Sequence, residues 1–330
     1  MSYLLKPLKA GPLTLSNRLV MPPMATMKAD VNGKVSKELL DHYAEKSNGG
    51  YIGLVIIEHS YIQPEGKVHD RQLSVADDSV VEGLQKLSNI IHCNGSRTVV
   101  QITHAGSATT EEIAGTTPVG PSTVMHPSKQ TLPRKLTILE IDDIITAFRN
   151  AAVRVKKAGF DGVEIHSAHG YLLNQFFSPL TNKRTDVYGG DVCNRINIHS
   201  QIIKAVREVV GEEFLIMVRL GVSDFMEGGT NVEDSKVAAQ ELEKAGLDIL
   251  DVSGGFLGYN VPGLIGQGFF APLSEAVKKV IAAPVILTGG ITEAQSAEKL
   301  LAEGKADLIG VGRAILKDSG WAGRAVEILR

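Results

Sequence analysis

Two histidines, His166 and His169, lie three residues apart just after an apolar run. Two imidazoles on one side of a site can both donate a hydrogen bond to one carbonyl oxygen. Such a pair withdraws electrons from the carbonyl group and stabilises negative charge that develops on its oxygen. Metal ligation is an alternative, but no carboxylate or cysteine is suitably spaced, so we expect no metal site. A purely structural role for both histidines is the other alternative.

Similar chemistry-bearing residues follow seven further apolar runs. Eight such positions that converge on one face of a fold are better explained by a site than by turns alone. The residues are Pro23, Met24, Ala25 and Thr26; Glu58 and His59; Gln101 and His104; His166 and His169; Arg219; Ser253 and Gly254; Gly289 and Gly290; and Gly312 and Arg313.

The last two positions predict a phosphate site. Gly289 and Gly290 follow the seventh run, and Gly312 and Arg313 follow the eighth. Glycine lets backbone N–H groups approach a ligand. In β/α barrels, the loops after the seventh and eighth strands form the recurrent phosphate site. The glycines alone are equally compatible with tight turns, but their combination with the Arg313 cation favours phosphate binding.

The positions just described depend on a regular alternation of short apolar runs with longer amphipathic segments. Continuous apolar runs of this length indicate strands of a parallel sheet that is buried on both faces. The predicted strands are Leu19–Pro22, Gly53–Ile57, Thr98–Ile102, Gly162–His166, Leu215–Leu220, Ile249–Val252, Pro284–Leu287 and Leu308–Val311. The predicted helices include Ser36–Glu45, Ile138–Ala158, Val232–Ala245 and Thr292–Glu303, and the last three stop at a glycine.

Eight strands that alternate with helices predict an α/β fold, a single (β/α)8 TIM barrel. A doubly wound open sheet is the alternative. Residues 1–18 predict a short N-terminal hairpin that caps the bottom of the barrel. Residues 105–137, rich in Thr, Pro and Gly, predict an irregular loop on the substrate rim. No linker or change in composition marks a boundary, so we expect one domain over residues 1–330.

Composition excludes several classes of function. The 330 residues carry a net charge of −3 with acids and bases interspersed, which favours neither nucleic acid nor an anionic membrane as partner. Cys93 and Cys193 are too few for a disulfide framework, an iron–sulfur cluster or a zinc site. We find neither a signal peptide nor an apolar span, and expect a cytoplasmic protein with a small-molecule substrate. The oligomeric state stays open, a homo-oligomer included.

The segment from His166 to Arg195 resembles the signature of the old yellow enzyme family of FMN-dependent ene-reductases. It contains the two histidines followed by Gly-Tyr, Ser-Pro, Asn-x-Arg-x-Asp and Tyr-Gly-Gly in register. The resemblance covers nearly the whole chain and includes Asn17-Arg18, the Pro-Pro-Met turn, Gln101 with His104, Arg219 and the terminal glycine loops. It implies FMN at the mouth of the barrel.

The resemblance also implies roles for individual residues. Gln101 would bind the pyrimidine edge of the flavin, and Arg219 would place a cation beside N1 and the C2 carbonyl, where it tunes the flavin potential. The other residues implied to bind FMN are Pro23, Met24 and Ala25 at the flavin edge, His59, His166 and Ser253, and Gly289, Gly290, Gly312 and Arg313 at the phosphate.

A ping-pong cycle is implied for the family. NADH or NADPH passes hydride to flavin N5, and the reduced FMN then passes it to the β-carbon of an α,β-unsaturated carbonyl compound. His166 and His169 would polarise the substrate oxygen, and Tyr171 would protonate the α-carbon. Packing alone is the plain alternative for Tyr171.

Two features depart from the family pattern. Many relatives carry Cys or Thr where this chain has Ala25, so flavin tuning is open there unless Thr26 substitutes, and Met27 stands where some bacterial relatives present a Tyr. Larger relatives of the dienoyl-CoA reductase type continue with a cysteine cluster and a nucleotide-binding domain. Because this sequence ends at Arg330 after the last helix, we expect neither.

Three other functions remain open at this point. An enoyl- or dienoyl-CoA-type reductase would act on acyl thioesters. A non-flavin phosphate-binding barrel enzyme would need a lysine or carboxylate base at a strand end; no lysine is there, although Glu164 and Asp251 lie within strands. A flavin-binding sensor would not need His166, His169 and Tyr171.

Overall fold

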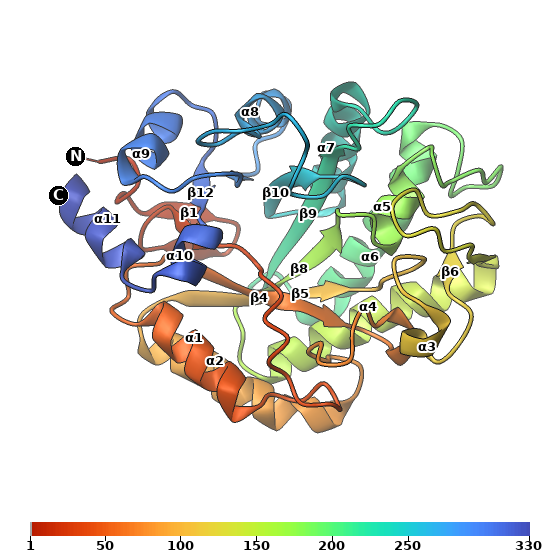
Figure 1. Ribbon diagram of the computed structural model, residues 1–330, viewed down its shortest axis with the longest axis horizontal. Coiled ribbons are helices and arrows are strands. Elements are labelled where there is room, and N and C mark those ends of the chain that lie inside the picture. Colours follow the sequence, from red (N-terminus) through yellow and green to blue (C-terminus); the bar gives the residue numbers. More distant parts are fainter. Residues whose placement is uncertain (1) are drawn as a thin grey trace.

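The eight predicted runs form eight parallel strands that close into a barrel in the computed structural model, which describes residues 2–330 (Figure 1). Each strand pairs with its neighbour along the chain, and the last pairs with the first. The (β/α)8 fold is confirmed, and the open sheet is excluded. The strands are β3 (Leu19–Met21), β4 (Leu54–Tyr61), β5 (Arg97–Thr103), β8 (Gly162–Ser167), β9 (Leu215–Ser223), β10 (Ile249–Gly254), β11 (Val285–Leu287) and β12 (Leu308–Gly310).

The strands β4 and β9 extend furthest past their apolar runs. β4 continues to Tyr61 and β9 to Ser223, because both keep hydrogen-bonding to neighbouring strands after the residues turn polar. The pairing of β4 with β5 shifts register between Ile57 and Ser60, which marks a bulge next to His59.

Helices surround the barrel (Figure 1). The longer ones are α1 (Lys37–Ser47), α2 (Val81–Cys93), α4 (Ile138–Lys157), α6 (Val192–Val210), α7 (Val232–Ala245), α8 (Ala271–Lys278), α9 (Ala294–Ala302) and α11 (Trp321–Leu329). The four predicted helices are all present within a few residues. Local sequence explains where they begin: Thr137 and Glu140 form a capping box at α4, and the Asn231 side chain caps α7.

The bottom of the barrel is filled by apolar side chains. Leu54 and Ile56 of β4 point into the barrel, whereas Val55 and Ile57 point toward the helices. The hairpin of β1 (Leu8–Ala10) and β2 (Leu13–Leu15) packs Ala10 and Leu15 against this inner cluster, which confirms the predicted cap. Polar side chains are therefore left for the opposite end, where the strands terminate.

The segment 105–137 is more ordered than expected. It contains α3 (Glu111–Ala114) and a pair of two-residue strands, β6 (Val119–Gly120) and β7 (Arg134–Lys135). The Arg184 guanidinium holds this segment in place by donating hydrogen bonds to the carbonyls of Pro121 and Leu136. None of its residues lines the cavity described below. No helix within residues 2–330 is long and apolar enough to cross a membrane.

Candidate active site

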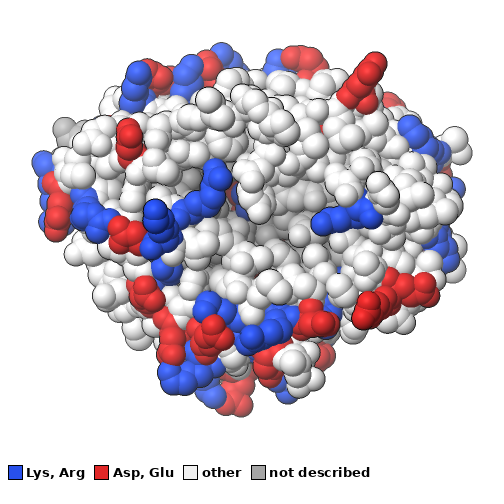
Figure 2. Space-filling view, in the orientation of Figure 1, with Lys and Arg blue, Asp and Glu red and all other residues white. Residues whose placement is uncertain are grey.

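A cavity of about 450 Å³ opens at the carboxyl ends of the barrel strands. Figure 2 shows this face of the molecule, with a hollow near its centre and basic side chains that reach toward it from two sides. All eight strands or the loops after them contribute to its lining, which is Pro22, Pro23, Met24, Ala25, His59, Gln101, His166, His169, Tyr171, Arg219, Tyr259, Phe269, Phe270, Thr288, Gly289, Gly290, Ile291, Thr292, Gly310, Gly312, Arg313 and Leu316. Every residue to which the family resemblance gave a role is in this set except Ser253, whereas Thr26, Glu58, His104 and Gly254, which also lie at strand ends, are not.

His166 and His169 lie together in one wall of the cavity, with ring centroids 5.0 Å apart and ring planes at 87°. His166 belongs to β8, and His169 lies in the turn to α5 (Leu172–Phe177). The backbone of His169 is left-handed, with φ +60°, a strained conformation for this residue. Its N–H donates to the Gly254 carbonyl, and its Nε2 is 2.7 Å from the Ser253 hydroxyl. Ser253 therefore lies behind the imidazole and holds it in place.

Both imidazoles are electrically neutral. Burial first, and then neighbouring histidines and Arg219, hold the pKa of His166 well below its ordinary value of 6.5. Burial and Arg219 do the same to the pKa of His169. The Nδ1 atom of His166 accepts a hydrogen bond from the Ala168 N–H at 3.3 Å, so its proton is on Nε2 and is available to a ligand.

Tyr171 lies beside this pair, at the N-terminus of α5. Its ring centroid is 4.9 Å from that of His166 and 5.7 Å from that of His59. Burial, with a smaller effect of Tyr259, raises the pKa of Tyr171 to about 12. The phenol therefore keeps its proton at neutral pH.

His59 is fixed by Gln72, whose amide nitrogen is 2.7 Å from Nδ1 and also donates to the His59 carbonyl at 3.2 Å. Because the amide NH₂ is a donor, Nδ1 accepts, and the proton of the neutral ring is on Nε2. Burial lowers the pKa of His59 to about 3, so it too is neutral.

Four side chains inside the barrel form what we call the polar floor: Gln101 of β5, Glu164 of β8, Arg219 of β9 and Asp251 of β10. Gln101 donates from Nε2 to Oε1 of Glu164 at 2.8 Å, which leaves its carbonyl oxygen for a ligand. Arg219 forms an ion pair with Asp251, with 3.2 Å between Nε and Oδ2. Gln101 and Arg219 line the cavity, so an amide and a cation face whatever it holds.

A phosphate cradle lies at another side of the cavity. Gly289 and Gly290 have φ +120° and +70°, conformations that favour glycine, and a Cβ on Gly290 would lie 2.2 Å from the Gly266 carbonyl oxygen. The backbone N–H groups of Gly290, Gly312 and Arg313 donate to no acceptor within residues 2–330. These amides and the exposed Arg313 side chain fit an anionic group.

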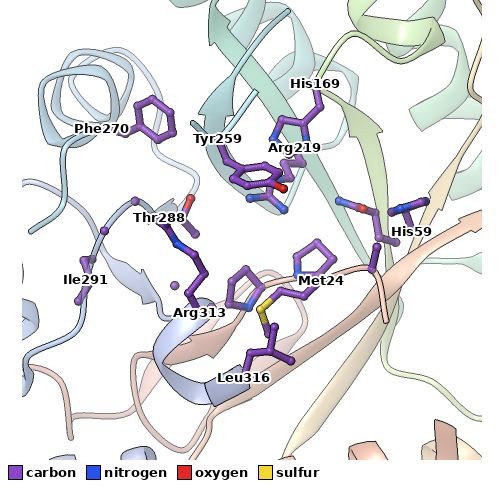
Figure 3. A pocket seen from close by; sticks show the side chains of 18 of the residues that line it. Met24, His59, His169, Arg219, Tyr259, Phe270, Thr288, Ile291, Arg313 and Leu316 are labelled. Carbon is purple, nitrogen blue, oxygen red and sulfur yellow. The ribbon is translucent and has the colours of Figure 1, made fainter. Parts of the chain in front are cut away.

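The loop between Gly255 and Phe270 contributes lining that the sequence did not predict. Tyr259 projects from this loop, and its ring centroid lies 5.6 Å from that of His169. Figure 3 shows Tyr259 near Arg219 and His169, with Met24 and Leu316 across the cavity. The side-chain oxygen Oδ1 of Asn260 accepts a hydrogen bond from Arg313 at 3.4 Å, which links the loop to the cradle. The length of this segment, between a strand and a helix, is the one sequence signal that could have indicated its role.

The loop after β3 contains the two positions at which the chain departs from the family pattern, Ala25 and Met27. Ala25 lines the cavity, whereas Thr26 does not, and the Thr26 hydroxyl accepts a hydrogen bond from the Lys28 N–H at 3.2 Å. Thr26 thus does not substitute for the side chain missing at Ala25. Met27 is 53% exposed and does not line the cavity.

The site fits FMN. A polar floor with a fixed cation suits the pyrimidine edge of a flavin, and the cradle with its unpaired amides suits a phosphate. The volume is within the usual range of small-molecule pockets. Gln101, Arg219, Gly290, Gly312 and Arg313 would hold the group.

Comparisons with known proteins agree with this geometry. The model of the NADH:flavin oxidoreductase / NADH oxidase family matches residues 3–329. An NADH oxidase of Thermoanaerobacter brockii is 43% identical over 326 residues, which cover 97% of this chain and 50% of the relative. An NADPH dehydrogenase of Clostridium acetobutylicum is 37% identical over 310 residues, 93% of this chain and 89% of the relative. The chain thus spans about half the length of the first of these relatives.

Solved structures are also similar. A 2-naphthoyl-CoA reductase in complex with 2-naphthoyl-CoA superposes with a TM-score of 0.93 and 29% identity, over 98% of this chain and 52% of the other. An old yellow enzyme homologue from Zymomonas mobilis gives a TM-score of 0.85 and 26% identity, over 99% of this chain and 93% of the other. These matches exclude the non-flavin barrel. The chain, which is similar to an old yellow enzyme homologue, therefore belongs to the NADH:flavin oxidoreductase / NADH oxidase family, and its cofactor is FMN.

Proposed function

We propose that this protein is an FMN-dependent NAD(P)H oxidoreductase that reduces the carbon–carbon double bond of α,β-unsaturated carbonyl compounds. The observation that carries the proposal is the grouping of two neutral imidazoles and a protonated phenol in one wall of the cavity. Bound FMN supplies a carrier that takes hydride from NADH or NADPH and gives it to the substrate. We propose a single FMN-binding domain over residues 1–330. Both cysteines are exposed and unpaired, which favours the reducing cytoplasm.

The two histidines bind and polarise the substrate oxygen. His166 presents Nε2–H to the cavity, because its Nδ1 is occupied by the Ala168 N–H. We assign the Ser253 hydroxyl as the donor to Nε2 of His169, which places the second proton on Nδ1. Two N–H donors on one oxygen stabilise the negative charge that develops there when hydride reaches the β-carbon. Since both rings are neutral, neither gives up its proton to the product.

Tyr171 completes the reaction by protonating the α-carbon. Its phenol is protonated and lies against His166, next to the bound carbonyl group. Tyr259, from the loop after β10, lies beside the same wall, with its ring centroid 5.6 Å from that of His169. A phenol is a suitable acid for an incipient enolate, because the α-carbon of an enolate is a stronger base than a phenolate.

We expect the rate of substrate reduction by reduced FMN to be nearly independent of pH. The lowered pKa values of His166 and His169 keep both rings uncharged, and the raised pKa of Tyr171 keeps its proton, from the ordinary histidine pKa of 6.5 up to the ordinary tyrosine pKa of 10.0. Stopped-flow measurement with 2-cyclohexenone checks this. An inflection near the ordinary histidine pKa that disappears in His166→Asn would contradict the assignment of neutral imidazoles.

The Arg313→Ala variant tests the phosphate cradle. Loss of a charge-assisted hydrogen bond predicts that the Kd for FMN rises about ten- to hundredfold, whereas the Kd for riboflavin, which lacks phosphate, changes by less than about twofold. Lys317→Ala is the matched control, because Lys317 is an exposed cation at the other end of α10 (Arg313–Lys317). Fluorescence titration of apoprotein measures both constants. An equal loss of affinity for FMN and riboflavin would show that Arg313 only supports the loop between Gly255 and Phe270.

Acyl thioesters are the second candidate substrates. The likeness to 2-naphthoyl-CoA reductase over 98% of this chain favours them. Steady-state turnover of 2-cyclohexenone and of crotonyl-CoA, each with NADH and with NADPH, separates the two. We expect turnover of the enone. Reduction of the thioester alone would shift the assignment to a CoA-type reductase, and turnover of neither would overturn the proposed activity.

A further inference from the structure

The polar floor holds three ionisable groups where a barrel usually has apolar side chains. Glu164 and Asp251 are fully buried, and Arg219 is 6% exposed. Strand pairing fixes their neighbours: Gln101 lies opposite Glu164, and Arg219 lies opposite Asp251. The floor therefore contains two carboxyl groups and a single cation.

The hydrogen bonds do not satisfy two ionised carboxylates. Oε2 of Glu164 and both carboxyl oxygens of Asp251 have no hydrogen-bond partner within the described residues. Asp251 at least has Arg219 beside it, whereas Glu164 receives a single hydrogen bond, from the neutral amide of Gln101. Burying a second negative charge without a cation would cost far more than retaining a proton.

The directions of the pKa shifts agree with one ionised and one protonated carboxyl group in the polar floor. Burial, and then the proximity of Asp251, raise the pKa of Glu164 well above its ordinary value. Burial also raises the pKa of Asp251, to about 6, but Arg219 opposes the effect. Both directions favour a proton on Glu164 and a negative charge on Asp251 at neutral pH.

We propose that the polar floor carries no net charge: Asp251 is the ionised partner of Arg219, and Glu164 is a neutral acid that holds Gln101. Asp251 is then a positioning residue. It fixes the Arg219 guanidinium and offsets its charge, which limits how strongly the floor prefers reduced, anionic FMN over oxidised FMN. The second part rests on the proposed placement of FMN over the floor.

Two isosteric variants test the charge assignment. Asp251→Asn removes a negative charge, so the ratio of the Kd for oxidised FMN to the Kd for dithionite-reduced FMN is expected to rise at least about tenfold. Glu164→Gln replaces a neutral acid by a neutral amide, so this ratio and the visible spectrum of bound FMN are expected to change by less than about twofold. A merely structural role for Asp251 would weaken both forms of FMN equally.

A tenfold rise of the ratio in Glu164→Gln would show that Glu164 is ionised and would overturn the proposal. An unchanged ratio in Asp251→Asn would also overturn it. Glu164→Gln keeps the shape of the protonated acid, so it tests the protonation state of Glu164 even where Asp251→Asn does not fold.

A measurement without flavin separates this inference from the proposed function. The infrared spectrum of the apoprotein at pH 8 is expected to contain the carbonyl band of a buried protonated carboxylic acid, and Glu164→Gln is expected to remove it. A band that persists in this variant, or that is absent from the unmodified protein, would overturn the assignment. Failure of the unmodified protein to bind FMN would instead refute the flavin site and leave the infrared result standing.

Discussion

Replacement of both His166 and His169 by alanine will slow the reoxidation of reduced FMN by 2-cyclohexenone at least about a thousandfold. The reason is that both hydrogen-bond donors to the substrate oxygen disappear, and the charge that develops on it is left without stabilisation. Reduction of FMN by NADPH will fall by less than about tenfold, because this half-reaction has no carbonyl oxygen to polarise. Stopped-flow absorbance measures the two half-reactions separately.

Two further variants make this test specific. His166→Asn with His169→Asn restores amide donors and is expected to recover part of the lost rate. His92→Ala removes a histidine of α2 that pairs with Asp161, outside the cavity, and is expected to leave both half-reactions unchanged. An equal loss of both half-reactions in the alanine pair would show that His166 and His169 serve FMN binding instead.

The Arg219→Met variant is expected to have the second largest effect. It leaves Asp251 as a buried carboxylate without a cation, which costs about 3–5 kcal/mol in the free energy of unfolding of the apoprotein. It also removes the cation that faces the flavin, so the Kd for FMN is expected to rise at least about a hundredfold. Urea denaturation and flavin titration measure the two effects.

The stability loss will depend on pH. Without Arg219, the pKa of Asp251 in the folded protein rises further above its value in the unfolded chain. The folded state then binds more protons than the unfolded state, so the loss shrinks as pH falls and Asp251 becomes neutral. A loss that is constant from pH 8 to pH 5 would contradict an ionised Asp251.

A double variant separates the two effects of Arg219. Arg219→Met with Asp251→Asn removes both charges and is expected to recover most of the stability, because a buried pair replaced as a whole costs little. It is not expected to recover FMN affinity. Recovery of both would mean that Arg219 acts on FMN only through the stability of the fold.

The barrel could be predicted from sequence because each buried strand is a continuous apolar run, and because polar residues begin where the strands end. The same rule located Gln101, Arg219 and the glycine cradle. It fails for Tyr259, because the segment between Gly255 and Phe270 has no periodicity and its position depends on contacts with His169 and Arg313.

Two other features could not be predicted from the sequence, because they depend on contacts between separate segments of the chain. Ser253 follows its apolar run as a flavin contact would, but the left-handed backbone of His169 brings that imidazole between Ser253 and the cavity. The pairing of Glu164 with Gln101 and of Asp251 with Arg219 depends on strand register, which the separate runs do not specify.

The most direct test of the proposed function is a single anaerobic turnover in D₂O. The protein is loaded with FMN, reduced by one equivalent of NADPH or NADH, and mixed with 2-cyclohexenone while the flavin absorbance is followed. We predict that the absorbance is lost on reduction, returns with the enone, and yields cyclohexanone with one deuterium at the α-carbon. Flavin that stays reduced with the enone and recovers its absorbance only with oxygen would contradict the account.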